Sequence, residues 1–247
     1  MVARAARELR DGEVVFVGIG LPNMACNLAK RTHAPNLVLI YESGAIGSRP
    51  SRLPVSIGDP ALAQGALSVC SIPDLFQYYL IGGRIDVGFL GIAQMDRFGN
   101  INTTVIGDYD SPRVRLPGSG GACEIATHAK RVLIVASQRK QSFPEAVDFV
   151  TSPGQMPNGR KRAELGLPGG GPRILITDLG VYVFDAEDGE LTLTERHPGV
   201  GIDQIRDSIG WDIRLGDDVS ETVPPTDEEL RIMREVLDPD HLFLKSA

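Results

Sequence analysis

The chain has 247 residues, of which 42% are hydrophobic and 23% charged, with a formal net charge of -7 and a sequence pI near 5.2. These values allow a large apolar core and exclude global disorder. The acidic balance, without any cluster of Lys and Arg, argues against nucleic acid or another polyanion as a partner.

Cysteine usage and hydropathy predict a soluble, cytoplasmic protein. The three cysteines, Cys26, Cys70 and Cys123, are scattered without C-x-x-C spacing, which is typical of a reducing compartment. The four histidines show no H-x-x-x-H or H-E-x-x-H pattern, so we expect no metal site. No stretch reaches the 18 or so apolar residues of a membrane span, and residues 1–10 lack the apolar core of a signal peptide. We therefore expect no membrane partner.

The beginning of the chain predicts a helix, a strand and a second helix. A helix pattern over residues 2–10 stops at a glycine, an apolar strand follows at 14–17, and an Ala/Leu-rich helix covers 23–31. The intervening turn, Gly18-Ile19-Gly20, begins a dinucleotide-binding fingerprint, but Asn23 stands where the third glycine is required. The turn therefore serves close helix–strand packing, or lets a ligand approach the backbone at Gly20.

The next strand ends on an acidic residue. Residues 37–40 are an unbroken apolar run, as expected of a strand covered on both faces, and the chain then turns through Glu42-Ser43-Gly44. Ligand crevices of open α/β sheets lie beyond the carboxyl ends of their strands, and Gly44 leaves room for close approach to the main chain. Glu42 is thus a candidate functional carboxylate, with a solvated surface charge as the alternative.

Beyond a proline-containing loop at residues 48–70, the apolar pattern alternates between helix and strand periods. The expected strands cover residues 85–91, 101–106, 132–136, 146–151, 174–177, 181–184 and 191–194, with a hairpin turn at Asp188-Gly189. The expected helices cover residues 71–81, 124–129, 202–209 and 226–237, the last of them starting with the capping-box pair Thr226 and Glu229. This alternation predicts an α/β fold with an open, mostly parallel or mixed sheet flanked by helices, as a single domain over residues 1–247.

Two glycine-rich stretches interrupt this pattern. Residues 116–122 precede a helix, so their backbone N–H groups form either an anion-receiving nest or a flexible connector. Residues 152–172 contain Gly169-Gly170-Gly171 without the Lys-Ser/Thr of a phosphate-binding loop, and predict a mobile surface loop. A strand-end carboxylate and a loop rich in N–H donors together suit covalent carboxylate catalysis on an acyl group.

Five motifs in order resemble the family I CoA-transferases. They are Gly-Ile-Gly-Leu-Pro (18–22), Tyr-Glu-Ser-Gly-x-Ile-Gly (41–47), Gly-Gly-Arg-Ile-Asp-Val-Gly-Phe-Leu-Gly (82–91), Gln-x-Asp-Arg-Phe-Gly-Asn-Ile-Asn (94–102) and Pro-Gly-x-Gly-Gly-Ala (117–122). More narrowly, the motifs are similar to those of the B (β) subunits of 3-oxoadipate and glutaconate CoA-transferases. Succinyl-type relatives have Glu-Asn-Gly where this chain has Glu42-Ser43-Gly44. The Glu-Ser-Gly sequence resembles the glutaconate-type branch of the family.

The resemblance implies a role for several residues. Glu42 would be the nucleophile, passing through an acyl-glutamyl anhydride to a glutamyl-CoA thioester in a ping-pong exchange. Gly120 and Gly121 would supply backbone donors near the acyl oxygen, and Asn102 or Thr103 a supporting polar group. Gly20, Ser43 and Gly44 complete the candidate substrate-binding set. No cofactor is expected to be bound permanently, since coenzyme A enters as a thioester substrate.

The resemblance also implies a second chain. The family works with a homologous A (α) subunit, in an α2β2 or larger assembly, so this chain is expected to be inactive alone. The implied substrates are succinyl-CoA as donor and a dicarboxylic or 3-oxo acid as acceptor in aromatic catabolism, with Arg49 or Arg52 facing a distal carboxylate or solvent. The alternatives are a CoA-thioester or ring-opening hydrolase of the same fold, and a non-catalytic partner subunit.

Overall fold

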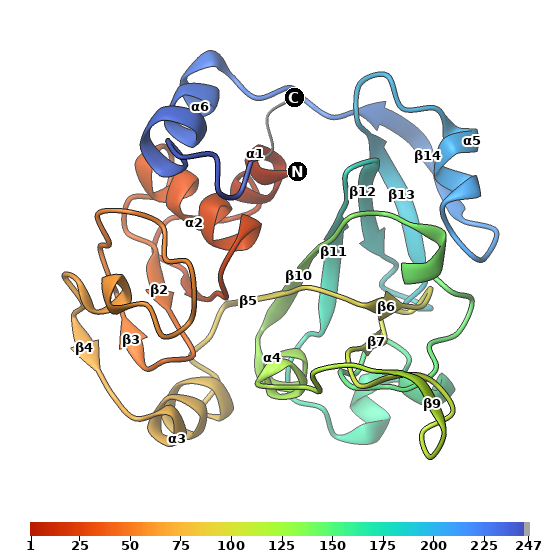
Figure 1. Ribbon diagram of the computed structural model, residues 1–247. Helices are drawn as coiled ribbons and strands as arrows, with labels where there is room; N and C mark the ends of the chain where they lie inside the picture. The colour runs from red at the N-terminus through yellow and green to blue at the C-terminus, as the bar shows by residue number, and fades with distance from the viewer. Residues whose placement is uncertain (245–247) are drawn as a thin grey trace. The chain divides into compact units, whose positions relative to one another are not determined.

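The computed structural model describes residues 1–244 and divides into two compact units (Figure 1). Unit 1 comprises Met1–Phe89 together with the chain from Val223 onward, and unit 2 comprises Leu90–Thr222. Each unit has its own strands and helices, and the single domain expected over residues 1–247 stays a prediction. Within residues 1–244 no helix is both long and apolar enough to cross a membrane.

Unit 1 is built on a mixed sheet with the strand order β5-β1-β2-β3-β4. The strands are β1 (Val14–Phe16), β2 (Val38–Ile40), β3 (Ala45–Ile46), β4 (Ser68–Val69) and β5 (Val87–Leu90). The first two predicted strands are therefore confirmed, and they pair in parallel with each other and, through β1, with β5. The short strands β3 and β4 are antiparallel additions inside the region expected to be a turn and a loop.

Helices from both ends of the chain pack together in unit 1. The helical segments are α1 (Val2–Ala6), α2 (Leu21–Arg31), η1 (Pro60–Ala63), α3 (Ile72–Asp74), the π-helical η2 (Leu75–Ile81), α6 (Asp227–Arg231) and the π-helical η6 (Ile232–Leu237). α2 packs against both α1 and η6. Arg7 joins the first helix to the last, because its guanidinium donates to the Glu229 carboxylate at 2.6 and 3.1 Å. The predicted capping box between Thr226 and Glu229 is confirmed by both of its hydrogen bonds.

The main strands of unit 2 pair in the order β14-β13-β12-β11-β10. Its elements are β6 (Gln94–Met95), β7 (Ile101–Asn102), β8 (Val105–Gly107), β9 (Pro112–Arg115), α4 (Ala122–His128), β10 (Arg131–Val135), η3 (Lys140–Ser142), η4 (Pro157–Gly159), η5 (Arg162–Leu165), β11 (Pro172–Ile176), β12 (Gly180–Phe184), β13 (Leu191–Arg196), α5 (Ile202–Asp207) and β14 (Arg214–Glu221). The pairs β10–β11 and β13–β14 are parallel, whereas β11–β12 and β12–β13 are antiparallel. The predicted α/β class with a mixed sheet is confirmed.

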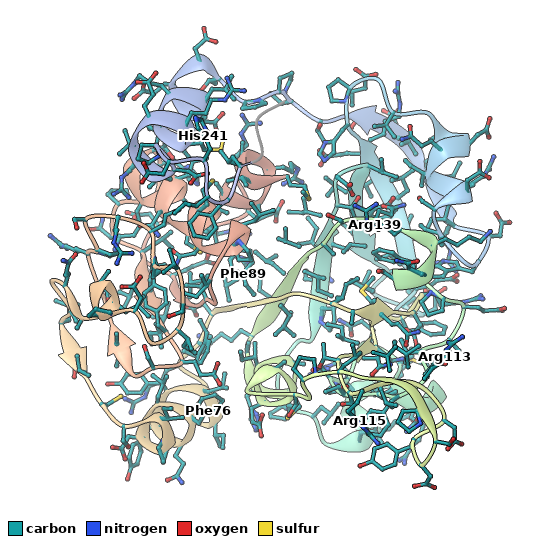
Figure 2. All side chains as sticks on the ribbon, in the orientation of Figure 1. Phe76, Phe89, Arg113, Arg115, Arg139 and His241 are labelled. Atoms are coloured by element: carbon teal, nitrogen blue, oxygen red, sulfur yellow. The ribbon has the colours of Figure 1, made fainter. Side chains whose placement is uncertain are left out.

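One prediction about the irregular segments of unit 2 is wrong. Residues 146–151 form no strand, because their side chains cover the β8–β9 hairpin instead: Phe149 stacks on Tyr109 at 5.5 Å, and Asp148 accepts the Gly107 N–H at 3.1 Å. Figure 2 shows Arg113 and Arg115 on the same hairpin. Residues 152–172 form an irregular segment with exposed residues at 158–161, as predicted, and their mobility stays a prediction. The segment is attached to α4, since the carbonyl oxygen of Thr127 accepts the Gly169 N–H at 2.8 Å.

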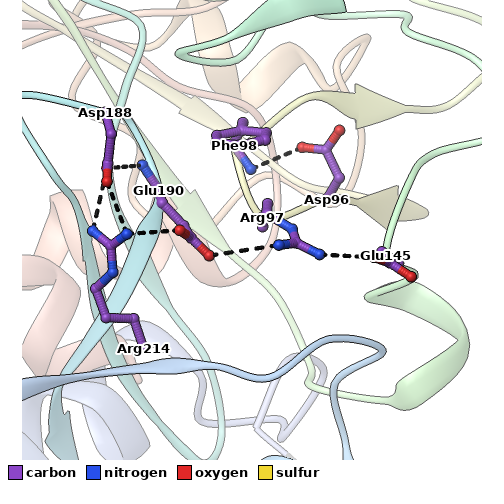
Figure 3. A network of polar contacts seen from close by, with 7 residues as sticks. All are labelled: Asp96, Arg97, Phe98, Glu145, Asp188, Glu190 and Arg214. Carbon is purple, nitrogen blue, oxygen red and sulfur yellow. Dashed lines mark hydrogen bonds and ion pairs between the residues drawn. The ribbon is translucent and has the colours of Figure 1, made fainter. Parts of the chain in front are cut away.

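The polar turn at residues 94–100 has a structural explanation (Figure 3). The Asp96 carboxylate accepts the N–H groups of Phe98 and Asn100 at 2.9 and 3.0 Å, which closes the turn. Arg97 forms ion pairs with Glu145 and Glu190 at 3.0 and 3.9 Å, and Arg214 continues the network through Asp188 and Glu190. Ion pairs this exposed contribute little free energy, so the turn depends chiefly on Asp96.

A polar network lies where β10, β11 and β13 of unit 2 end. The Gln138 Oε1 accepts the hydroxyl groups of Thr177 and Tyr182 at 2.8 and 2.7 Å. The His197 ring lies 2.8 Å from the Thr177 carbonyl oxygen through Nε2 and 2.8 Å from the Thr222 hydroxyl through Nδ1. Because a carbonyl only accepts, Nε2 carries the proton and Nδ1 accepts from Thr222. The neutral imidazole therefore satisfies both of its ring nitrogens.

This arrangement predicts a stability loss on mild acidification. Burial lowers the pKa of His197 below its ordinary value of 6.5. The unfolded chain then takes up a proton more readily than the folded chain, so the free energy of unfolding falls as the pH drops through 6.5 and levels off below the folded pKa. Urea denaturation at pH 7.5 and pH 5.5 should show this loss in the wild type and a smaller one in His197→Gln. An NMR titration placing the His197 pKa at or above 6.5 would contradict it.

Candidate active site

The carboxyl ends of two parallel strands bring Gly20 and Glu42 to one edge of the unit 1 sheet. β1 and β2 pair with Phe16 opposite Ile40, and the Val17 N–H continues the ladder to the Ile40 carbonyl at 3.0 Å. The segments that follow the two strands, residues 18–20 and 41–44, therefore start side by side. This is the edge at which open α/β sheets bind their ligands.

Glu42 and Ser43 occupy the centre of a tight turn between β2 and β3. The Gly44 N–H donates to the Tyr41 carbonyl at 2.8 Å, and the Tyr41 N–H donates to the Ala45 carbonyl at 3.0 Å. Gly44 has φ +96°, and a Cβ at this position would lie only 2.0 Å from the Cys70 carbonyl oxygen. The Cys70 N–H donates in turn to the Gly44 carbonyl at 3.1 Å. The turn is thus fixed against the chain beside β4, and only glycine fits at its end.

The Glu42 carboxylate is available for chemistry. The residue is half-buried, and within residues 1–244 it has neither a hydrogen-bond nor an ion-pair partner. The adjacent Ser43 hydroxyl is buried and likewise has no partner in the described part of the chain. Buried polar atoms normally have partners, and exceptions are concentrated where a ligand supplies the missing bond. A free carboxylate next to a free hydroxyl is therefore the most reactive arrangement in this turn.

Buried hydrogen bonds connect Tyr41, at the start of the Glu42 turn, to two asparagines of α2. The Tyr41 hydroxyl donates to Asn23 Oδ1 at 3.3 Å, and Asn27 Nδ2 donates to the same oxygen at 2.5 Å. Burial raises the pKa of the Tyr41 phenol, so the hydroxyl keeps its proton as a donor. Sequence reasoning missed both asparagines. The available signal was their spacing, because asparagines four residues apart share one face of a helix that is otherwise apolar.

Gly20 lies at the start of α2 with φ +91° and ψ -145°, a conformation that favours glycine. No atom lies within 4 Å of the position that a Cβ would occupy there. The space in front of Gly20 is thus open, which agrees with the expectation that a ligand can approach the backbone there.

The two candidate arginines differ. Arg52 donates both Nη groups to the Asp59 carboxylate at 2.7 and 2.9 Å, and this contact holds the pKa of Asp59 well below its usual value. Arg49 is exposed and has no ion-pair partner among the described residues. Of the two, Arg49 is therefore the guanidinium left for an anionic ligand.

The remaining candidates lie in unit 2. Asn102 is fully buried; its Nδ2 donates to the Gln94 side chain and the Val105 carbonyl at 2.7 and 2.6 Å, while its Oδ1 accepts the Thr104 and Val105 N–H groups. Its amide is thus fully used in shaping the chain between β7 and β8. Thr103 contacts the glycine loop, residues 118–121, directly, because its hydroxyl donates to the Gly118 carbonyl at 2.8 Å.

The glycine loop ends at α4, with Gly121 as the residue that precedes the helix. Gly120 has φ +48° and is exposed, whereas Gly121 is buried with φ -87°. Within residues 1–244 neither of their N–H groups has a hydrogen-bond partner. Two adjacent unused donors match the nest interpretation better than the flexible connector. Over the whole of residues 1–244, no group of three or more His, Cys, Asp or Glu side chains is arranged to hold a metal ion.

Comparison with known proteins agrees with these observations. A family model described as coenzyme A transferase matches residues 1–208. The B (β) polypeptide of the 3-oxoadipate CoA-transferase of Pseudomonas knackmussii is 53% identical over 234 residues, covering 95% of this chain and 90% of the relative. The crystal structure of glutaconate coenzyme A-transferase from Acidaminococcus fermentans superposes with a TM-score of 0.90 at 33% identity, covering 100% of this chain and 96% of the other.

A structure of the decarboxylase AibA/AibB superposes less closely, with a TM-score of 0.83 at 28% identity, covering 98% of this chain and 94% of the other. The architecture alone thus accommodates more than one chemistry. The family model nevertheless covers most of the chain, including the Glu42 turn and the glycine loop. From this match and the 53% identity, the chain belongs to the coenzyme A transferase family.

Proposed function

We propose that this chain is the β subunit of a CoA-transferase that moves coenzyme A from an acyl-CoA, such as succinyl-CoA, to a dicarboxylic or 3-oxo acid. The observation that carries the proposal is the free, half-buried Glu42 carboxylate in a turn that Gly44 and Cys70 hold in place. The high identity to the corresponding polypeptide of a 3-oxoadipate CoA-transferase supports the substrate class. Arg49 is the candidate to pair with a distal carboxylate of the acid.

In the proposed reaction, a Glu42 oxygen attacks the thioester carbonyl carbon and the C–S bond breaks. The products are an acyl-glutamyl anhydride and the CoA thiolate. The thiolate attacks the Glu42 carbonyl carbon, which releases the acyl group as a free carboxylate and leaves a glutamyl-CoA thioester. The acceptor carboxylate then repeats both steps in reverse, so that Glu42 is regenerated and the acceptor leaves as its CoA thioester.

Each attack turns a carbonyl oxygen into an oxyanion. We assign the unused N–H groups of Gly120 and Gly121 to this oxygen, and one such donor is typically worth about 3–4 kcal/mol. The free Ser43 hydroxyl is a further donor for the same charge, and open space at Gly20 accommodates the substrate backbone. Asn102 acts indirectly, since its amide shapes the segment that carries Thr103. Water has to be excluded, because it would hydrolyse the anhydride.

The proposal includes a homologous α subunit that completes the site, in an α2β2 or larger assembly. We place the enzyme in the cytoplasm, which suits its free thiols at Cys26, Cys70 and Cys123.

A trapping experiment tests the proposal. The chain reconstituted with its α subunit is incubated with succinyl-CoA alone, and peptides containing Glu42 are analysed by mass spectrometry. We expect a CoA adduct on Glu42 that is absent in Glu42→Ala and absent when either polypeptide is omitted. Steady release of succinate and CoA without an acceptor would instead indicate a hydrolase. The absence of both adduct and turnover would indicate a non-catalytic partner subunit.

A further inference from the structure

Arg162 is a buried arginine in the segment of unit 2 that was expected to be a surface loop. Only 7% of the residue is exposed to solvent. A guanidinium has five N–H donors, and all five are used here. The acceptors are backbone carbonyl oxygens of Gly169 (3.1 Å), Pro153 (3.2 Å), Gly154 (3.0 Å), Ala126 (2.8 Å) and Thr127 (3.3 Å).

These partners are unusual for a buried cation, because none of them is a carboxylate. Removing a charge from water is costly, and burial lowers the pKa of Arg162 to about 10, so the side chain remains protonated at neutral pH. Part of the compensation comes from Ala126 and Thr127, whose carbonyls lie near the carboxyl end of α4, where the helix dipole favours a positive charge. A position that only needed to fill space would be filled at lower cost by an apolar side chain.

The surrounding glycines are shaped to admit this guanidinium. A Cβ at Gly171 would lie 2.8 Å from the Arg162 guanidinium, and a Cβ at Gly169 would lie 2.4 Å from the Ala129 carbonyl oxygen. The Gly169 N–H also donates to the Thr127 carbonyl, beside the Arg162 contact. The glycines at residues 169–171 therefore let the backbone pack closely against Arg162 and the end of α4.

Arg162 connects both ends of the glycine loop at residues 118–121. Downstream, the loop continues directly into α4, whose last turn Arg162 binds. Upstream, the loop is held by Thr103, through the Gly118 N–H and the Gly118 carbonyl, both at 2.8 Å. Thr103 is held in turn by the Thr151 hydroxyl at 2.9 Å, two residues before the Pro153 carbonyl that Arg162 binds. One guanidinium thus joins the two anchors of the loop.

We propose that Arg162 is a positioning residue for the transferase reaction, which holds the Gly120 and Gly121 N–H groups in the geometry that the oxyanion requires. The inference rests on the proposed function, in which those two groups stabilise the developing charge. Backbone donors act only within about 0.5 Å of the productive position, so a small shift of α4 or of residues 151–154 would weaken them without touching substrate.

Hydrogen–deuterium exchange on the chain alone tests the positioning. Arg162→Lys keeps the charge but loses the planar fork and two donors, and Arg160→Lys is the matched control, because Arg160 is exposed two residues away. We expect peptides over residues 116–129 to exchange about tenfold faster in Arg162→Lys, with residues 172–184 of β11 and β12 unchanged. Unchanged exchange over 116–129 would overturn the proposal. So would faster exchange of every peptide, since Arg162 would then stabilise the whole unit.

Steady-state kinetics of the reconstituted enzyme test the catalytic consequence. We expect Arg162→Lys to lower kcat about 10–100-fold with KM within about threefold of wild type, and Arg160→Lys to change neither. Faster exchange over residues 116–129 together with an unchanged kcat would show that Arg162 orders the loop without contributing to the reaction, and would overturn the proposal. Failure of the proposed function is recognised separately, because the wild type would then form no Glu42 adduct whatever the exchange data show.

Discussion

Replacing Glu42 with glutamine is expected to lower the transferase kcat by at least about 10⁴-fold, because the amide cannot attack the thioester. No other side chain of the turn can substitute, since Ser43 offers only a neutral hydroxyl. The measurement is the initial rate of acceptor-CoA formation by the chain reconstituted with its α subunit. Glu235→Gln is the matched control, because Glu235 is an exposed glutamate of the same unit, and its activity should equal that of the wild type.

The same variant should leave the fold intact. The Glu42 carboxylate has no partner within residues 1–244, so its removal breaks no internal contact, and the free energy of unfolding should change by less than about 0.5 kcal/mol. Loss of activity together with a large loss of stability would point to a structural role for Glu42. Activity within tenfold of wild type would eliminate Glu42 as the nucleophile and with it the proposed mechanism.

The predictable part of the fold is the part encoded by local pattern. The apolar run before Glu42 forms β2, the Thr226–Glu229 pair forms a capping box, and Asp188-Gly189 lies between β12 and β13. Each of these signals depends on residues adjacent in the sequence. The alternation of helix and strand patterns likewise predicted the mixed α/β class.

Elements that depend on distant partners were missed. β14 is a charged, largely exposed strand, and it is recognised by its pairing with β13 and not by its sequence. β3 and β4 are two residues each, and they exist because the Glu42 turn returns along β2. Residues 146–151 have a strand-like composition, yet they cover a hairpin instead of joining a ladder. Composition does not distinguish these outcomes, because they are decided by which surfaces meet.

The candidate site shows the same division. Glu42, Gly44 and Gly20 follow from strand-end and glycine chemistry, and the structure brings their segments to one sheet edge of unit 1. The spacing of Asn23 and Asn27 could have marked the two asparagines as a pair. Their contact with Tyr41 and the contacts of Arg162 were not predictable, since each joins residues separated by many positions through side-chain geometry. Asn102 was selected by motif, and its saturated amide became visible only with its four hydrogen bonds.

Replacing Gly44 with alanine is expected to destabilise unit 1 by about 3–5 kcal/mol and to abolish activity. Two costs combine: a positive φ of +96° is unfavourable for alanine, and the added Cβ would lie 2.0 Å from the Cys70 carbonyl oxygen, which is backbone and has little freedom to move. Gly12→Ala separates the two costs, because Gly12 also has a positive φ, of +80°, but nothing lies within 4 Å of its Cβ position.

The control should therefore lose only the backbone term of about 1–2 kcal/mol and keep full activity. Urea denaturation followed by circular dichroism gives both values, and the Glu42 adduct assay reports whether the turn still functions. To admit the methyl group, the chain must break the hydrogen bond between the Cys70 N–H and the Gly44 carbonyl, which moves the end of the Glu42 turn. Equal stability losses in Gly44→Ala and Gly12→Ala would mean that the turn is not fixed against Cys70, and that Glu42 is positioned by its strand alone.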